Sequence, residues 1–204
     1  MNILRKHVRE VKLSDVLVPP ALSFKVPSVD KYDGLEVITK GSEEDVPVYV
    51  QMHVSDTRQW LSFLKDILIE EHANANGGLA LFVDCAFQLG STSLRNTFLN
   101  EVFNEFGGES SDQSLFNRVI VWNDISTLNE INAKLSSLVA NIDEERLDYG
   151  LDYVVISNLS VFYWQMRESN DYSDLVAFHE VCKEVSRTYR CNVISALSFL
   201  EGMR

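Results

Sequence analysis

A short apolar run in the second half of the chain, Tyr153 to Ile156, constrains the fold more than any other feature. Such runs, rich in β-branched residues, are typical of a strand that is buried on both faces of a parallel sheet. Two polar residues, Ser157 and Asn158, follow it directly. Open α/β sheets bind their ligands outside the carboxyl ends of these strands. The stretch therefore predicts a central strand that ends at a ligand-binding edge but carries no carboxylate there.

Further strands and amphipathic helices alternate along the chain. The expected strands cover residues 35–39, 46–52, 79–83, 118–122, 153–156 and 191–196, and the expected helices cover 57–71, 92–106, 127–142 and 172–189. In the first helix, apolar residues from Trp60 to Leu68 recur at helical spacing, and Asp56 is placed to cap its amino terminus. Strands alternating with helices predict a three-layer α/β protein, in which a mainly parallel central sheet lies between two layers of helices.

The first 33 residues differ from the rest. The amino terminus is basic and includes Arg5, Lys6 and Arg9, and the prolines that follow favour extended chain. We therefore predict two regions, a basic arm with a Pro-bounded extended segment over 1–33 and a core domain over 34–204. The arm is a candidate contact for nucleic-acid phosphates, and a solvated terminal helix or strand is the alternative.

Composition narrows the classes of function. The net charge of −12 argues against a chain that coats nucleic acid alone, because duplex binding relies on Lys and Arg. No apolar run approaches the roughly 20 residues of a membrane span, and the amino terminus lacks a signal-peptide pattern, so we expect a soluble intracellular protein. Cys85, Cys182 and Cys191 show no metal-ligand spacing, so we expect reduced thiols in the core.

No constellation of residues indicates catalysis or metal binding. The histidines are scattered without a neighbouring nucleophile or ligand partner, at positions His7, His53, His72 and His179. We therefore predict no catalytic residue, no metal and no cofactor.

Three segments of the sequence resemble segments of a known family. They are LEVITKGSEE before the first core strands, VDCAFQLGSTSLRNTF after a later strand, and VVISNLSVFYW, which is followed by a long helix and the strand CNVISA. Over roughly 34–198 the chain resembles the RecA-like ATPase core, specifically the paralogues of the eukaryotic strand-exchange recombinase. The resemblance implies a RecA-like three-layer αβα sandwich. Because the family continues with further strands after CNVISA, it also implies a sheet truncated at its C-terminal end.

The resemblance also locates three parts of a nucleotide-hydrolysis site, and none carries the residue that the reaction needs. The family's Gly-Lys-Thr matches Asp56, Thr57 and Arg58. The acid that polarises water matches Ala86, and the acid that orients the metal matches Ser157. An acid would repel a triphosphate, and neither Ala nor Ser replaces a carboxylate. The resemblance therefore implies a protein that is not an enzyme.

The last helix carries a second candidate site for nucleic acid. Lys183, Arg187 and Arg190 share one helix face. In the resembled family the DNA-contacting loops follow the strands near 157 and 196, which makes this basic face a candidate for a place near a nucleic-acid groove. Charge pairing with acids of the same helix on a solvated face is the alternative.

Aromatic residues are candidates for a subunit interface. Three aromatic residues just past the end of the central strand either fold into the core or contact a partner, namely Phe162, Tyr163 and Trp164. Phe24 in the Pro-bounded segment is the other interface candidate.

The function implied by the resemblance is structural. The chain looks like a non-catalytic recombinase-paralogue subunit of the Shu-complex type, located in the nucleus. It would pair with another paralogue in a heterodimer or larger complex, contact DNA through that complex, and promote recombinase filament assembly on single-stranded DNA in homologous recombination and DNA repair. It could also contact the recombinase itself. The alternative is a RecA-like scaffold subunit of a tRNA-modifying Elongator-type assembly, which also lacks the phosphate loop.

Overall fold

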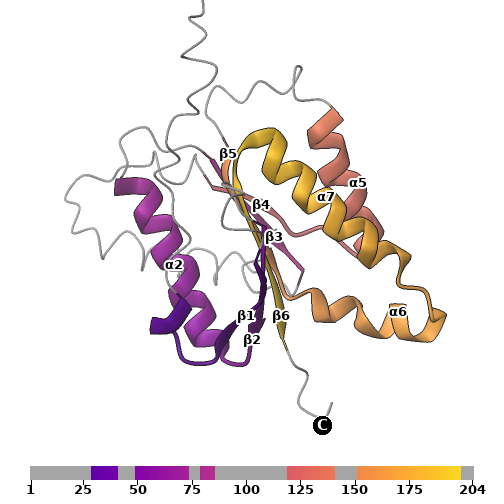
Figure 1. The fold of residues 1–204 in the computed structure, drawn as a ribbon, viewed down its shortest axis with the longest axis horizontal. Coiled ribbons are helices and arrows are strands. Elements are labelled where there is room, and N and C mark those ends of the chain that lie inside the picture. The colour runs from indigo at the N-terminus through magenta and orange to yellow at the C-terminus, as the bar shows by residue number, and fades with distance from the viewer. Residues whose placement is uncertain (1–28, 41–48, 74–78, 86–118, 141–150, 199–204) are drawn as a thin grey trace, which may run out of the picture.

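The computed structural model describes residues 29–40, 49–73, 79–85, 119–140 and 151–198 (Figure 1). The strands in these ranges are β1 (Leu35–Lys40), β2 (Tyr49–Val54), β3 (Leu79–Asp84), β4 (Val119–Trp122), β5 (Leu151–Ser157) and β6 (Asn192–Ser198). The α-helices are α2 (Thr57–Ala73), α5 (Leu128–Ala140), α6 (Tyr163–Ser169) and α7 (Ser173–Tyr189). Two 3₁₀ turns, η2 (Val29–Lys31) and η3 (Leu159–Phe162), complete the described elements. The predicted α/β class is confirmed.

The strands form one six-stranded sheet in the order β1-β2-β6-β5-β3-β4. Only the β1–β2 pair is antiparallel, and the other four pairs are parallel. The mainly parallel sheet is therefore confirmed, and the carboxyl ends of its five parallel strands share one edge, called here the carboxyl edge. The apolar run from Tyr153 to Ile156 lies in β5, between β3 and β6, and is buried as expected.

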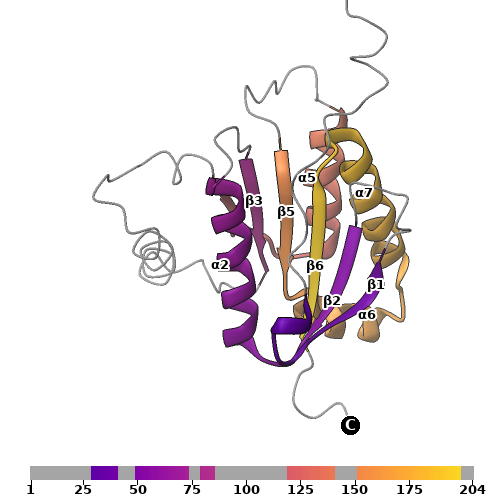
Figure 2. The ribbon, with the colours of Figure 1, turned by 60° about the vertical axis from the view of Figure 1, so that its left-hand side comes forward.

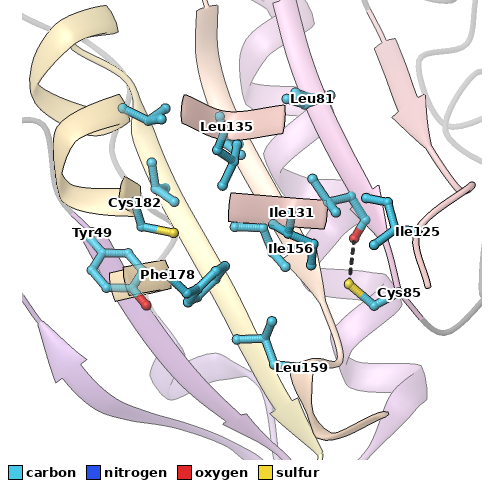
Figure 3. Packing of buried hydrophobic residues seen from close by; sticks show 14 of the residues in the cluster. Tyr49, Leu81, Cys85, Ile125, Ile131, Leu135, Ile156, Leu159, Phe178 and Cys182 are labelled. Atoms are coloured by element: carbon cyan, nitrogen blue, oxygen red, sulfur yellow. Dashed lines mark hydrogen bonds between the residues drawn. The ribbon is translucent and has the colours of Figure 1, made fainter. Parts of the chain in front are cut away.

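Helices cover both faces of the sheet: α2 lies on one face, and α5 and α7 lie on the other (Figure 2). The α2 stripe of Trp60, Phe63, Leu64 and Ile67 packs in one apolar cluster with residues of the strands. Figure 3 shows the opposite cluster, in which the helix residues Ile131, Leu135, Phe178 and Cys182 surround strand residues such as Leu81 and Ile156. The inner strands β2, β3, β5 and β6 contribute side chains alternately to the two clusters, which is the period of a two-sided sheet.

Three short elements were not predicted, namely η2, η3 and α6. The helix α6 has no buried residue, so it lacks the apolar stripe by which a helix is found in a sequence. The predicted helix at 92–106 and the predicted truncation of the sheet after residue 198 lie outside the described residues. Among the residues that are described, every helix is too short or too polar to cross a lipid bilayer.

Gly34 connects the segment before the sheet to β1 in a conformation that suits glycine. Its φ is +80°, and a Cβ atom there would stand 2.6 Å from Ser55 Oγ. The Gly34 carbonyl accepts hydrogen bonds from the Ser55 amide at 2.8 Å and from Ser55 Oγ at 3.0 Å. The turn before β1 is therefore bonded to the connection between β2 and α2.

The residues just before Gly34 are fixed to the outer side of α2. Lys31 Nζ forms an ion pair with Asp66 at 3.1 Å, and the Tyr32 hydroxyl donates a hydrogen bond to the same carboxylate. The Tyr32 ring meets Phe63 edge-on, with 5.3 Å between ring centroids. The described end of the amino-terminal region thus packs on the core domain.

We predict that Gly34→Ala destabilises the protein by about 1 to 3 kcal/mol, because the added methyl group meets Ser55 and the positive φ is strained for alanine. Urea unfolding measures the change in the free energy of unfolding. The neighbouring exposed substitution Asp33→Ala serves as the control and should change this free energy by less than about 0.5 kcal/mol. Equal stability of the two variants would contradict the close approach at Gly34.

Candidate functional site

Ser157, the residue at the end of the central strand, bonds β5 to β3. It is the register partner of Asp84, and the two residues are only 7% and 2% exposed. Ser157 Oγ accepts a hydrogen bond from the Cys85 amide at 3.0 Å. Its own proton reaches the Val83 carbonyl at 3.2 Å or Asp84 Oδ1 at 3.4 Å. The Ser157 hydroxyl therefore closes a buried hydrogen-bond network between two strands.

The thiol of Cys85 lies beside this network and points back to the Val83 carbonyl at 3.8 Å (Figure 3). Burial, and then the charge of Asp84, raises the pKa of Cys85 to about 12. Burial also raises the pKa of Cys191 to about 12 and that of Cys182 well above its ordinary value. All three cysteines are free and buried, so the prediction of core thiols is confirmed. Thiols held neutral in this way are poor nucleophiles.

The connection between β2 and α2 consists of only Ser55 and Asp56. Asp56 Oδ1 accepts hydrogen bonds from the amides of Arg58 at 2.7 Å and Gln59 at 3.4 Å, which confirms the predicted helix cap. The Ser55 amide is bonded to Gly34. A phosphate at a helix amino terminus needs free amides and no competing anion. Here the chain itself uses these amides and adds a carboxylate. Ala86, the third position of interest, lies outside the described residues.

The basic residues at the end of α7 lie away from the edge at which β5 and β6 end. Arg190 ends the helix just before β6 begins, so Arg187 and Arg190 stand at the edge where the parallel strands start. The loops after residues 157 and 196 leave from the opposite edge. Lys183 is paired with Glu180 at 2.8 Å. Whether this face contacts DNA stays a prediction, but Arg187 and Arg190 are not beside the carboxyl edge.

The three aromatic candidates have different environments. Phe162 is 3% exposed and belongs to the core, Tyr163 is half-buried, and Trp164 is 48% exposed. The Trp164 ring contacts Tyr163 edge-on at 5.5 Å and lies 5.2 Å from the Arg167 guanidinium. Of the three, Trp164 is therefore the side chain with surface to offer a partner. The remaining predicted site residues, Arg5, Lys6, Arg9 and Phe24, lie outside the described ranges.

A pocket of about 330 Å³, which the sequence did not indicate, lies on the α7 face near the carboxyl edge. Its wall is mostly apolar and includes Ile38, Leu128, Leu159, Met166, Leu175 and Leu197. Two tyrosines and a few other polar residues complete it, namely Tyr163, Tyr172, Gln51, His53, His179, Ser160 and Ser198. The described lining contains no Lys, Arg, Asp or Glu. Separately, no group of three or more His, Cys, Asp or Glu in the described part of the chain is arranged to hold a metal ion.

One wall of the pocket contains hydrogen bonds between α7, β2 and β6. The Tyr49 hydroxyl lies 2.7 Å from His179 Nδ1 and 3.3 Å from Ser195 Oγ. Burial, followed by the charge of Lys183, lowers the pKa of His179, and Glu180 partly opposes this. Burial also raises the pKa of Tyr49 above its ordinary value. At neutral pH both rings are therefore uncharged.

No protein-family model and no curated protein matches this chain in sequence. Its function is therefore argued from the residues and their geometry.

We predict that Ser157→Ala lowers the free energy of unfolding by about 1 to 3 kcal/mol, because the buried Cys85 amide loses its acceptor. Urea unfolding measures the loss. Ser160→Ala is the matched control, since Ser160 is half-buried on η3 and makes none of the side-chain hydrogen bonds described above. If the two variants are equally stable, the strand-end network contributes nothing.

We also predict that stability falls as the pH drops below 6.5, the ordinary pKa of histidine. Because the pKa of His179 is lowered in the folded state, the unfolded state binds more protons as the pH falls below 6.5. The contribution of neutral His179 to the free energy of unfolding is therefore complete only above pH 6.5. A pH series of urea unfolding curves measures the slope. The His179→Gln variant should show a flatter slope.

The groups that face His179 are Tyr49 from β2 and Glu180 and Lys183 from its own helix. The carboxylates with lowered pKa values, Asp124, Asp171 and Glu180, start from 3.8 or 4.5 and so act at more acidic pH. An unchanged slope in His179→Gln between neutral pH and pH 5 or so would assign the effect to another group.

Proposed function

We propose that the chain is a non-catalytic RecA-like subunit of the recombinase-paralogue type that works in a heteromeric complex on single-stranded DNA. The observation that carries the proposal is the connection between β2 and α2. Where a nucleotide-hydrolysing relative needs a glycine-rich loop with free amides, this chain has two residues, an aspartate cap and a bond to Gly34. These hydrogen bonds support a chain that does not bind a nucleotide at this connection.

The arrangement of strands supports the finer assignment of a RecA-like sandwich. Phosphate binding, water activation and metal binding are parts of one reaction, so the strands that carry them must end close together. Here β3 and β5 are neighbours, with Asp84 beside Ser157, and β2 ends at the same edge, separated from β5 only by β6. This strand order is compatible with a RecA-like core, and Ser157 and Asp56 are used for structural hydrogen bonds, which favours an inactive one.

Charge and exposure support a role through partners. With a net charge of −12, the chain has little means of holding DNA phosphates alone. Trp164, half exposed and next to Arg167, is the kind of residue that dominates binding energy in protein interfaces. In the proposed mechanism the inert core pairs with a second paralogue in the nucleus, and the joint surface contacts DNA or the recombinase.

We predict that the purified chain binds no Mg·ATP in isothermal titration calorimetry and that, when isolated from its native cell, it forms a complex with a recombinase paralogue. This complex should prefer single-stranded or forked DNA to duplex DNA, and native mass spectrometry should give its composition.

In the Trp164→Ala variant, partner binding should weaken at least about tenfold, because interface Trp residues are frequent hot spots. Ile120→Ala, which changes an exposed apolar residue on the distant edge strand β4, is the control.

Other outcomes point to other functions. Measurable ATP affinity would overturn the argument from the β2–α2 connection. Preferred binding of tRNA together with a hexameric mass would favour the Elongator-type scaffold.

A further inference from the structure

Gln51 is a mostly buried polar side chain of β2 that lines a pocket. It is 7% exposed, and its side chain lines the pocket of about 330 Å³ on the α7 face. A polar side chain in the wall of a pocket fixes the orientation of what binds there. Because Gln51 lines the cavity, its carboxamide can form hydrogen bonds with a separate molecule.

A second polar residue of the lining, His179, is held by hydrogen bonds from residues behind it. Tyr49 lies two residues from Gln51 on the same face of β2, and its hydroxyl bonds both Ser195 and His179. We assign the protons so that Ser195 donates to Tyr49 and Tyr49 donates to His179 Nδ1. The neutral His179 ring then carries its proton on Nε2. This N–H is the remaining donor of a residue that lines the pocket.

The rest of the lining limits what the pocket can hold. It has no charged side chain among the described residues, so a phosphate or carboxylate would lose its hydration without gaining a counter-charge. Aliphatic side chains and the rings of Tyr163 and Tyr172 favour a flat apolar body. The volume is at the lower end for ligand sites, and the place near the ends of parallel strands is typical of them.

We propose that this pocket binds an uncharged flat heterocycle whose edge has a hydrogen-bond donor next to an acceptor, as in a nucleobase. The Gln51 carboxamide has the complementary acceptor and donor, and side-chain amides pair with base edges in this two-bond manner. His179 Nε2 supplies a further donor. The base could belong to a free nucleoside or to an unpaired position in a nucleic acid. The pocket does not depend on the proposed function, because it needs neither a partner subunit nor inactivity toward ATP.

Calorimetry and ligand-observed NMR on the full chain test this proposal. The probes are thymidine, a thymidine oligonucleotide and 1,3-dimethyluracil, which keeps the ring and its acceptors but lacks the donor. Thymidine or the oligonucleotide should bind, and 1,3-dimethyluracil should bind at least about tenfold more weakly, since one base-edge pair is lost. Binding of the oligonucleotide without thymidine would identify nucleic acid as the source of the base.

Two variants connect binding to the pocket. Gln51→Leu keeps a buried side chain of similar length but removes donor and acceptor, so it should fold normally, which a urea unfolding curve checks, and lose binding at least about tenfold. His179→Gln, which keeps a polar group beside Tyr49, should cause a smaller loss. The proposal is wrong if no probe binds the wild-type chain, if 1,3-dimethyluracil binds as well as thymidine, or if Gln51→Leu binds unchanged. None of these results bears on the ATP and partner experiments.

Discussion

The burial of β5 on both faces is the constraint on which the rest of this structure depends. Tyr153 and Val155 point into the cluster under α2, and Val154 and Ile156 point into the cluster under α5 and α7. A strand with two apolar faces is stable in water only when helices cover both. This requirement sets the alternation of strands and helices and makes the sheet mainly parallel. The carboxyl ends of β2, β3, β5 and β6 therefore lie at one edge of the sheet.

Sequence reasoning succeeded where the signal is local. The central strand, the cap at Asp56 and the burial of the cysteines follow from periodicity and from residues a few positions apart. It missed the Tyr49–His179 bond, whose partners are 130 residues apart, and the buried position of Gln51. Both depend on β2 lying beside β6, and no hydrophobic pattern states which strands are neighbours. The helix α6 escaped because it buries no side chain.

The position of the basic residues at the end of α7 follows from the direction of the helix. A helix that connects two parallel strands must run opposite to them, so its last turn returns to the edge where the next strand begins. Arg187 and Arg190 therefore lie at the starting edge of β6, although their spacing on one helix face was read correctly. Positive charge gathers at that edge of α7. The carboxyl edge has a pocket without charged side chains and the exposed ring of Trp164.

The bond between Gly34 and Ser55 has a consequence for how such a protein can change over time. Replacing Asp56 with glycine would still leave two residues between β2 and α2, with the Gly34 carbonyl already bonded to the Ser55 amide. A nucleotide-binding loop could be built here only by inserting residues and moving the segment in front of β1 together. Single substitutions change neither the length of this connection nor its bond to the segment in front of β1.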